Sequence, residues 1–185
     1  MPKPTKAEIN ADIIDRAAAL FAQHGFGQTS LQQIADAVNY SKAGLLHHFP
    51  SKAAIYAAAI GVVRDQMLEL RHKVRDMPVG MARDREIVEA SVQFTYDWPG
   101  VSALANRFSN GTPDDDAEQI EIAMIRYDAL GIDPTKVDTE RMVRVTSAFN
   151  GLGVTAVKAV RVDLKREWRD VIVRTAMDAL GHGNP

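Results

Sequence analysis

The sequence predicts an all-α fold. Apolar residues recur every three or four positions through most of the 185-residue chain, which is the period of one face of an α-helix. Residues that typically begin or end helices (Ser, Thr, Asn, Gly and Pro) lie between these apolar runs, and no stretch requires a strand. We therefore expect helices in two parts, a compact N-terminal domain at residues 1–52 and a larger helical domain at residues 53–185.

Composition limits the classes of protein that the chain can belong to. The net charge is −2, so bulk charge gives no argument for a nucleic-acid partner. The absence of cysteine excludes disulfides and thiolate metal sites, and it fits a reducing compartment. No apolar run approaches the ~20 residues of a membrane-spanning helix, and no signal-peptide pattern is present. We expect a cytoplasmic protein that does not bind a membrane.

The N-terminal part reads as two helices that lead into a tight turn. An amphipathic helix over residues 7–24 is expected to end at Gly25. A second helix is expected to begin with Thr29 as N-cap, because Gln32 follows at the spacing of a capping box. Asn39 should end this helix, since asparagine tolerates the left-handed conformation of a sharp turn.

A third, very short helix follows the turn. Ser41 is its predicted N-cap, and Pro50 prevents its continuation. Its outward residues are small, basic or able to hydrogen-bond, and none is acidic, as suits a helix in the major groove of DNA. The candidate DNA contacts, including helix-end hydroxyls and a following lysine, are Thr29, Ser41, Lys42, Ala43, Gly44, His47, His48 and Lys52.

This segment resembles the N-terminal signature of the tetracycline-repressor (TetR) family. The residues that match in order and spacing are Thr29, Ile34, Ala35, Ser41, Lys42, Leu45, His47, Phe49, Pro50, Ser51 and Lys52. The resemblance implies phosphate contacts from Thr29, His48 and Lys52, and groove contacts from Lys42, Ala43, Gly44 and His47. Departures from the family occur at Asn39, where a turn glycine is usual, and at Leu46 and His48, where aromatic residues are common.

A longer helical array should follow. The apolar stripe over residues 51–76 predicts a helix long enough to connect the N-terminal part with the remainder. A break is expected at 77–81, with further helices over 83–98, 99–110 and 114–131.

Two long helices are expected near the C-terminus. The resemblance implies that they form a four-helix bundle with the same pair in a second subunit. Such a homodimer would place two recognition helices about 34–36 Å apart on a palindromic site.

Six large side chains of the second part are candidates for a ligand pocket that takes a partly apolar or aromatic small molecule. They are Phe94, Trp98, Phe108, Met124, Tyr127 and Phe149. Simple core packing is the alternative for each of them, but together they supply enough aromatic surface to line a pocket. The resemblance favours the pocket, because C-terminal domains of this family sense ligands.

The function expected from these patterns and from the resemblance is a ligand-responsive transcriptional regulator, a repressor, that binds a palindromic DNA operator as a homodimer and is released by a small molecule. Two alternatives from other classes remain: a helical interaction module without DNA binding, and a dinucleotide-binding enzyme that uses the G-x-G-x-x-A pattern at 151–156. The acidic residues at 114–118 suit the first turn of a helix better than a cation site. We expect no catalytic residues, no metal site and no cofactor.

Overall fold

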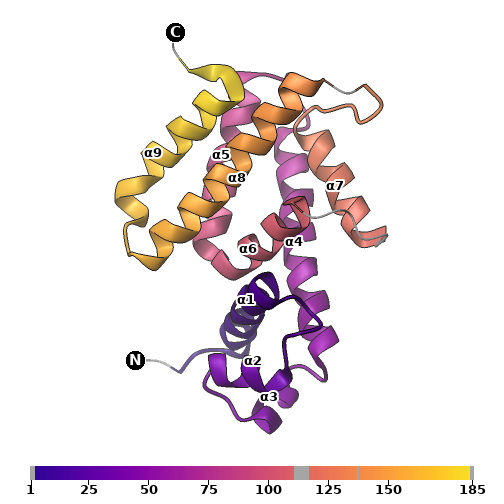
Figure 1. Cartoon of the computed structure of the whole chain (residues 1–185), viewed down its shortest axis with the longest axis vertical. Helices are drawn as coiled ribbons and strands as arrows, with labels where there is room; N and C mark the ends of the chain where they lie inside the picture. The colour runs from indigo at the N-terminus through magenta and orange to yellow at the C-terminus, as the bar shows by residue number, and fades with distance from the viewer. Residues whose placement is uncertain (1–2, 111–116, 137, 184–185) are drawn as a thin grey trace.

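The computed structural model describes residues 3–110, 117–136 and 138–183, and the side chains of all of these except 108–110. Within these ranges the regular structure is helical throughout and no strand occurs, which confirms the all-α prediction. The elements in chain order are α1 (Lys6–His24), α2 (Leu31–Ala37), α3 (Lys42–His48), α4 (Lys52–Val74), α5 (Met81–Asp97), α6 (Pro99–Asn110), α7 (Ala117–Ala129), α8 (Thr139–Arg161), α9 (Lys165–Met177) and a π-helical turn, η1 (Asp178–His182) (Figure 1).

The helices α1–α3 form a compact head at one end of the molecule (Figure 1). The head has its own apolar core, in which Ile13, Phe21, Ile34 and Leu45 are at most 1% exposed. The first half of α4 and one face of α6 complete this core. The boundary at residue 52 stays a prediction, but residues beyond it clearly take part in the core of the head.

The helix α4 leaves the head and enters the second part of the molecule (Figure 1). Its 23 residues span about 35 Å at the usual rise of an α-helix. Ile55 is buried in the core of the head, whereas Leu70 and Val74 are buried in a second core with α5, α7, α8 and α9. The predicted connector is therefore confirmed, and its N-cap is Ser51, as expected.

One predicted helix start was wrong. Ser30, not Thr29, is the N-cap of α2: its hydroxyl accepts the Gln33 N–H at 3.2 Å, and its own N–H donates to Gln33 Oε1 at 2.7 Å. The sequence reads Thr-Ser-Leu-Gln-Gln here, so two overlapping capping boxes are possible and spacing alone cannot choose between them. Tertiary structure decides, because the Thr29 side chain is buried and its hydroxyl donates to the Gly25 carbonyl at 2.8 Å.

Other helix boundaries agree with the sequence to within a few residues. The break after α4 is confirmed, and α5 begins at Met81 after Gly80, whose φ of 146° favours glycine. The helix expected over 114–131 corresponds to α7, which runs over Ala117–Ala129. Residues 114–116 lie outside the described residues, so only Glu118 of the predicted acidic cluster can be placed, in the first turn of α7.

The glycines of the G-x-G-x-x-A pattern lie in the middle of α8. A dinucleotide fingerprint requires a strand directly before the glycines and a helix after them. Gly151 and Gly153 have helix on both sides, so the dinucleotide alternative lacks its structural basis. No helix of the described residues is long and apolar enough to cross a membrane.

A buried ionic cluster ties α5, α8 and η1 together. The Asp84 carboxylate is 1% exposed and accepts hydrogen bonds of 2.7 Å from both Nη atoms of Arg141. His182 Nε2 lies 2.7 Å from the second Asp84 oxygen. Burial opposes the charge of Asp84, but Arg141 and His182 together hold the pKa of this carboxyl below its usual range. The C-terminal turn is thereby fixed against the second core.

Candidate functional site

The α2–turn–α3 unit of the head has the geometry of a helix-turn-helix. Asn39 adopts the predicted left-handed conformation with φ 58°, which lets the chain turn between the two helices. The Ser41 hydroxyl accepts the Gly44 N–H at 3.0 Å and so caps α3, as predicted. Leu45 is fully buried and anchors α3 to the core of the head. The side of α3 that carries Lys42 and His47 is left outward-facing.

The predicted groove-facing residues lie on this outward side. Ser41, Lys42, Ala43 and His47 are exposed, while Gly44 and His48 are half-buried. Short side chains at the start of α3 permit a close approach to base edges, and Lys42 and His47 can reach base edges or phosphates. The structure therefore brings the predicted groove contacts together on one surface; their contact with DNA stays a prediction.

Tyr40 is a residue of this surface that sequence reasoning missed. Its ring packs over Gly44, where an added Cβ would lie 3.2 Å from Tyr40 Cδ1. The same ring makes an edge contact with His48 at 5.5 Å between centroids. His48 Nδ1 in turn pairs with Asn10 Oδ1 of α1 at 2.8 Å. Gly44 thus has a packing role as well, and His48 is oriented by Tyr40 and Asn10.

Two predicted phosphate contacts have structural roles inside the head. Lys52 Nζ donates to the carbonyls of Phe26 and Thr29 at 2.6 and 2.7 Å and lies 4.3 Å from the centroid of the Phe26 ring. The Thr29 hydroxyl is buried, as described above. Lys52 keeps one N–H donor for a phosphate, whereas Thr29 could contribute only through the loop that it positions.

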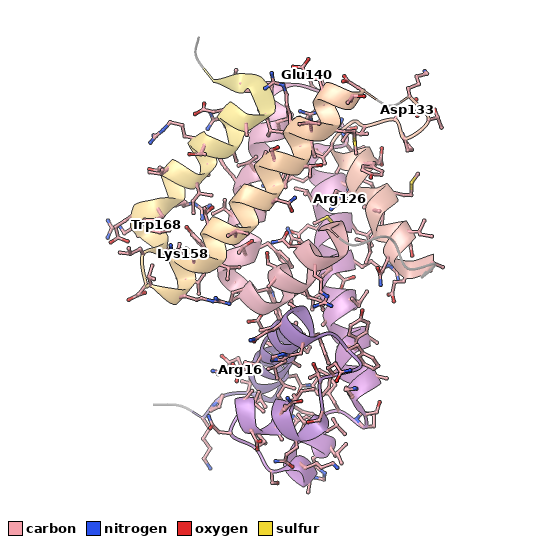
Figure 2. All side chains as sticks on the ribbon, in the orientation of Figure 1. Arg16, Arg126, Asp133, Glu140, Lys158 and Trp168 are labelled. Carbon is pink, nitrogen blue, oxygen red and sulfur yellow. The ribbon has the colours of Figure 1, made fainter. Side chains whose placement is uncertain are left out.

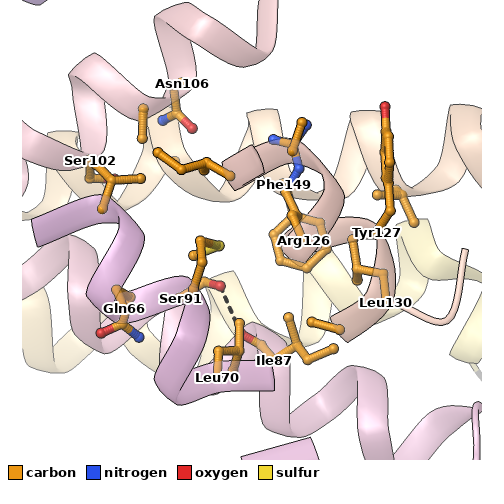
Figure 3. Close-up of a pocket in the computed structure, with 18 of the residues that line it drawn as sticks. Gln66, Leu70, Ile87, Ser91, Ser102, Asn106, Arg126, Tyr127, Leu130 and Phe149 are labelled. Atoms are coloured by element: carbon orange, nitrogen blue, oxygen red, sulfur yellow. Dashed lines mark hydrogen bonds between the residues drawn. The ribbon is translucent and has the colours of Figure 1, made fainter. Parts of the chain in front are cut away.

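A cavity of about 550 Å³ lies in the second part of the molecule, between α4, α5, α6, α7 and α8. Figure 3 shows the side chains that surround it, with Gln66 and Leu70 of α4 on one side and Asn106 of α6 on the other. The volume is in the range of small-molecule sites in proteins. Its wall is mainly apolar, as expected for a site that takes a partly apolar ligand.

Four of the six side chains predicted for a pocket line this cavity. They are Phe94, Met124, Tyr127 and Phe149. Trp98 is not among the lining residues; it packs against the core of the head. Trp98 comes directly after α5, where the chain turns into α6 and toward α1. The spacing of apolar residues does not reveal this turn. The side chain of Phe108 lies outside the described residues.

The polar residues of the cavity wall, except Tyr127, were not predicted. The amides among them are Gln66, Asn106, Gln119 and Asn150, and the hydroxyls belong to Ser91, Thr95, Ser102, Tyr127 and Thr146. Arg126 is the one charged residue among the described residues of the wall. Only Gly153 offered a sequence signal: a small residue in a helix permits close approach, and Asn106 Nδ2 lies 2.1 Å from where a Gly153 Cβ would stand.

The helix α6 connects the cavity with the head. Its N-terminal amides at Gly100 and Val101 donate to Asp15 Oδ1 of α1 at 2.8 and 2.9 Å. Its other end is tied to α1 as well, because Arg107 Nη1 donates to the Ala22 carbonyl at 2.8 Å. Burial raises the pKa of the Asp15 carboxyl above its ordinary value, although the two α6 amides oppose this shift.

Gly100 allows the close contact between α6 and α1. A Cβ at this position would lie 1.9 Å from the Asp15 carbonyl oxygen and 3.0 Å from the Ala19 nitrogen. Ser102 and Asn106, on the same helix, line the cavity. One helix therefore contacts both the cavity and the head. Among the described residues, no cluster of three or more His, Asp or Glu side chains could hold a metal ion.

The described residues form a helix-turn-helix head joined to a helical domain with a cavity. These features place the protein in the class of two-part helix-turn-helix proteins. Comparison with known families agrees: residues 13–59 match the model described as bacterial regulatory proteins, tetR family. The head of the chain, together with the start of α4, is therefore similar to the DNA-binding part of this family. The family model describes bacterial regulatory proteins, and the relatives that match the chain are transcriptional regulators.

Individual relatives match over about half of the chain. The HTH-type transcriptional regulator RutR of Escherichia coli is 34% identical over 92 residues, which is 50% of this chain and 43% of RutR. The negative transcriptional regulator IcaR of the biofilm operon in Staphylococcus aureus is 46% identical over 86 residues, which is 46% of this chain and 43% of IcaR. The chain thus aligns with less than half the length of these relatives.

Solved structures extend the likeness to the whole fold. A TetR-family transcriptional regulator from Bordetella parapertussis has a TM-score of 0.61 at 24% identity, over 96% of this chain and 98% of that one. AmtR of Mycobacterium smegmatis has a TM-score of 0.53 at 22% identity, over 100% of this chain and 90% of that one. The second part of the molecule therefore shares the fold of such proteins.

Proposed function

We propose that the chain is a ligand-responsive transcriptional repressor of the cytoplasm, which binds a palindromic DNA operator as a homodimer and releases it when a small molecule enters the cavity. The observation that carries this proposal is the exposed outer face of α3, with Lys42 and His47 beside the short side chain of Ala43. RutR and IcaR, which match about half of the chain, are transcriptional regulators, and IcaR is a negative one.

The DNA contacts would divide between groove and backbone. Lys42, Ala43, Gly44 and His47 approach base edges, while the Ser41 end of α3 and the ring of His48 meet phosphates. Thr29 and Lys52 contribute mainly by fixing the loop before α2. Tyr40 holds the start of α3 in place through its contact with Gly44.

The homodimer would form through α8 and α9, which lie side by side at one edge of the molecule (Figure 1). Figure 2 labels Glu140 and Lys158 at opposite ends of α8 and Trp168 on α9. Large apolar side chains are exposed on this pair of helices: Val143, Val154 and Val171 are 60%, 69% and 50% exposed. Burying such valines in a two-fold bundle would stabilise the dimer and set the distance between the two heads.

Release of DNA would be a shift between two conformations of the dimer. A ligand in the cavity contacts α6 through Ser102 and Asn106 and α4 through Gln66 and Leu70. Both helices continue into the core of the head, so a ligand that fits one arrangement of α6 and α4 better also favours one spacing of the heads. Equal affinity for both arrangements would shift nothing.

The proposal is tested by fluorescence anisotropy of a labelled duplex from the region upstream of the protein's own gene, titrated at several salt concentrations. We expect saturable binding with a steep loss of affinity as salt rises. Lys42→Ala should weaken binding and flatten the salt slope, whereas Lys136→Ala, in the loop before α8, should change neither. If the protein binds this duplex no more tightly than a random one, a genome-wide selection of bound DNA fragments is the next step. If no fragment is bound more tightly than a random duplex, the proposal is overturned in favour of an interaction module.

A further inference from the structure

Two asparagine side chains, one on α6 and one on α8, line the cavity near the crossing of these helices. Asn106 of α6 and Asn150 of α8 both line the cavity. Asn106 rests against the backbone of α8 at Gly153, one helical turn beyond Asn150, because the glycine has no Cβ there. Figure 3 shows the Asn106 carboxamide on the α6 side of the cavity, across from Gln66 of α4.

These carboxamides differ in their hydrogen bonding from three hydroxyls of the same wall, those of Ser91, Thr95 and Ser102. Ser91 Oγ donates to the Ile87 carbonyl at 2.7 Å (Figure 3), and the hydroxyls of Thr95 and Ser102 share a hydrogen bond of 2.8 Å. Neither Asn106 nor Asn150 has a side-chain hydrogen bond to any residue that the structure describes. Since a carboxamide both donates and accepts, the pair can bind amides, carbonyls and hydroxyls alike.

The charge of the wall limits the ligand further. No carboxylate occurs among the described residues of the wall, so a cation would lose its hydration without gaining a partner. Arg126 could attract an anion, but it already has interactions within the protein, including a contact with the Tyr127 ring at 5.8 Å. An uncharged ligand needs neither a carboxylate nor a free cationic side chain in the wall.

We propose that the effector is an uncharged molecule with an aromatic or otherwise apolar body, and that Asn106 and Asn150 bind its hydrogen-bonding group. This inference rests on the proposed function, because it names the chemical class that enters the cavity. The aromatic side chains of Phe94 and Phe149 pack against the body of the ligand. Gln66 contributes from α4, so recognition of the polar group spans helices that reach the head.

The test uses three naphthalene derivatives that differ in the charge of one substituent: 2-naphthamide, 2-naphthoate and 2-(aminomethyl)naphthalene as its ammonium form. Isothermal titration calorimetry with the full chain measures their dissociation constants. We expect 2-naphthamide to bind about tenfold or more tightly than either ion, which corresponds to one well-made neutral hydrogen bond and no buried charge.

Two alanine substitutions on α8 provide a matched pair. Gly153→Ala places a Cβ 2.1 Å from Asn106 Nδ2, so the flexible end of Asn106 must leave its position. Gly151→Ala meets nothing within 4 Å and gains the same helix propensity. We expect Gly153→Ala to weaken 2-naphthamide about tenfold and Gly151→Ala to leave it unchanged. Asn106→Leu, which keeps the size of the side chain, should reproduce the loss even if Gly153→Ala does not fold.

The outcomes separate this inference from the proposed function. Tightest binding by 2-naphthoate or by the ammonium compound, no binding by any of the three, or equal affinity of 2-naphthamide for the wild type and Asn106→Leu would each overturn it. These results do not depend on DNA. A chain that binds 2-naphthamide as expected but recognises no operator would leave the inference standing and remove the proposed function instead.

Discussion

Four polar side chains of the head and the two asparagines of the cavity wall differ in whether they have hydrogen-bond partners. In the head, Ser30, Ser41, His48 and Lys52 each have a hydrogen-bond partner within the chain. In the cavity wall, the carboxamides of Asn106 and Asn150 have none among the described residues. Side chains that hold α2 and α3 in place gain from being fixed by neighbours, whereas a site for a ligand must keep hydrogen-bonding capacity free.

The two regions also differ in what holds them together. The core of the head is apolar and closely packed around Leu45 and Phe21. The second part adds a buried ionic cluster around Asp84 and leaves a cavity. Substitutions in the ionic cluster, in the core of the head and at the contact between the two regions test this difference through the free energy of unfolding.

The largest effect is expected from Asp84→Ala. It leaves Arg141, whose side chain is only 20% exposed, without its buried carboxylate, and should lower the free energy of unfolding by about 3–5 kcal/mol. Urea denaturation followed by circular dichroism measures the change. Asp76→Ala is the control, because that carboxylate is 85% exposed and should matter by less than about 0.5 kcal/mol. Equal effects of the two substitutions would show that the cluster contributes nothing special.

The same cluster predicts a dependence on pH. The folded-state pKa of Asp84 is lowered, so its contribution is complete above the ordinary value near ~3.9 and is lost as pH falls through the lower folded value. Wild-type stability should therefore decline in that acid range more steeply than the stability of Asp84→Ala. Parallel profiles of the two proteins would contradict the assignment.

In the head, Leu45→Ala should lower the free energy of unfolding by about 2–5 kcal/mol, because it opens a cavity at a fully buried position. Its neighbour Leu46 is 38% exposed, and Leu46→Ala should cost less than about 1 kcal/mol. DNA binding should weaken in the Leu45 variant, since this residue anchors α3. If both substitutions had the same cost, the register of α3 would be wrong.

A smaller effect is expected where the two regions meet. Gly100→Ala forces a Cβ against backbone atoms of α1 that cannot move away, and should cost about 1–3 kcal/mol. It should also reduce the effect of ligand on DNA affinity, measured by anisotropy with and without 2-naphthamide. Gly61→Ala, which has open space at its Cβ in α4, is the control. An unchanged ligand response in Gly100→Ala would exclude α6 as the connection.

The smallest effect is expected from Asp15→Asn. The asparagine oxygen can still accept the amides of Gly100 and Val101, so unfolding at neutral pH should change by less than about 1 kcal/mol. Because the folded pKa of Asp15 is raised, its contribution is present below the ordinary value and is lost as pH rises through the folded value. In Asp15→Asn the free energy of unfolding should no longer fall as pH rises through this range. If urea denaturation gave the same pH dependence for the variant and the wild type, the prediction for Asp15 would be wrong.

Most of the head could be predicted from the sequence because its signals are local. The Asn39 turn, the Ser41 cap and the stop at Pro50 each depend on residues a few positions apart, and all three are confirmed. The choice between Thr29 and Ser30 as N-cap was the exception. Both satisfy the local rule, and only the burial of Thr29 against the end of α1 separates them.

The sequence by itself determined that the chain is helical, where its helices break and which short helix faces outward, because backbone capping and apolar periodicity act over one or two turns. Only the tertiary structure decided which side chains surround the cavity. Trp98 and Phe94 both pack against the core of the head, yet only Phe94 also lines the cavity. Asn106 faces the cavity only because Gly153, distant in sequence, leaves room at the crossing of α6 and α8. Such contacts depend on how helices cross, and no local pattern encodes a crossing.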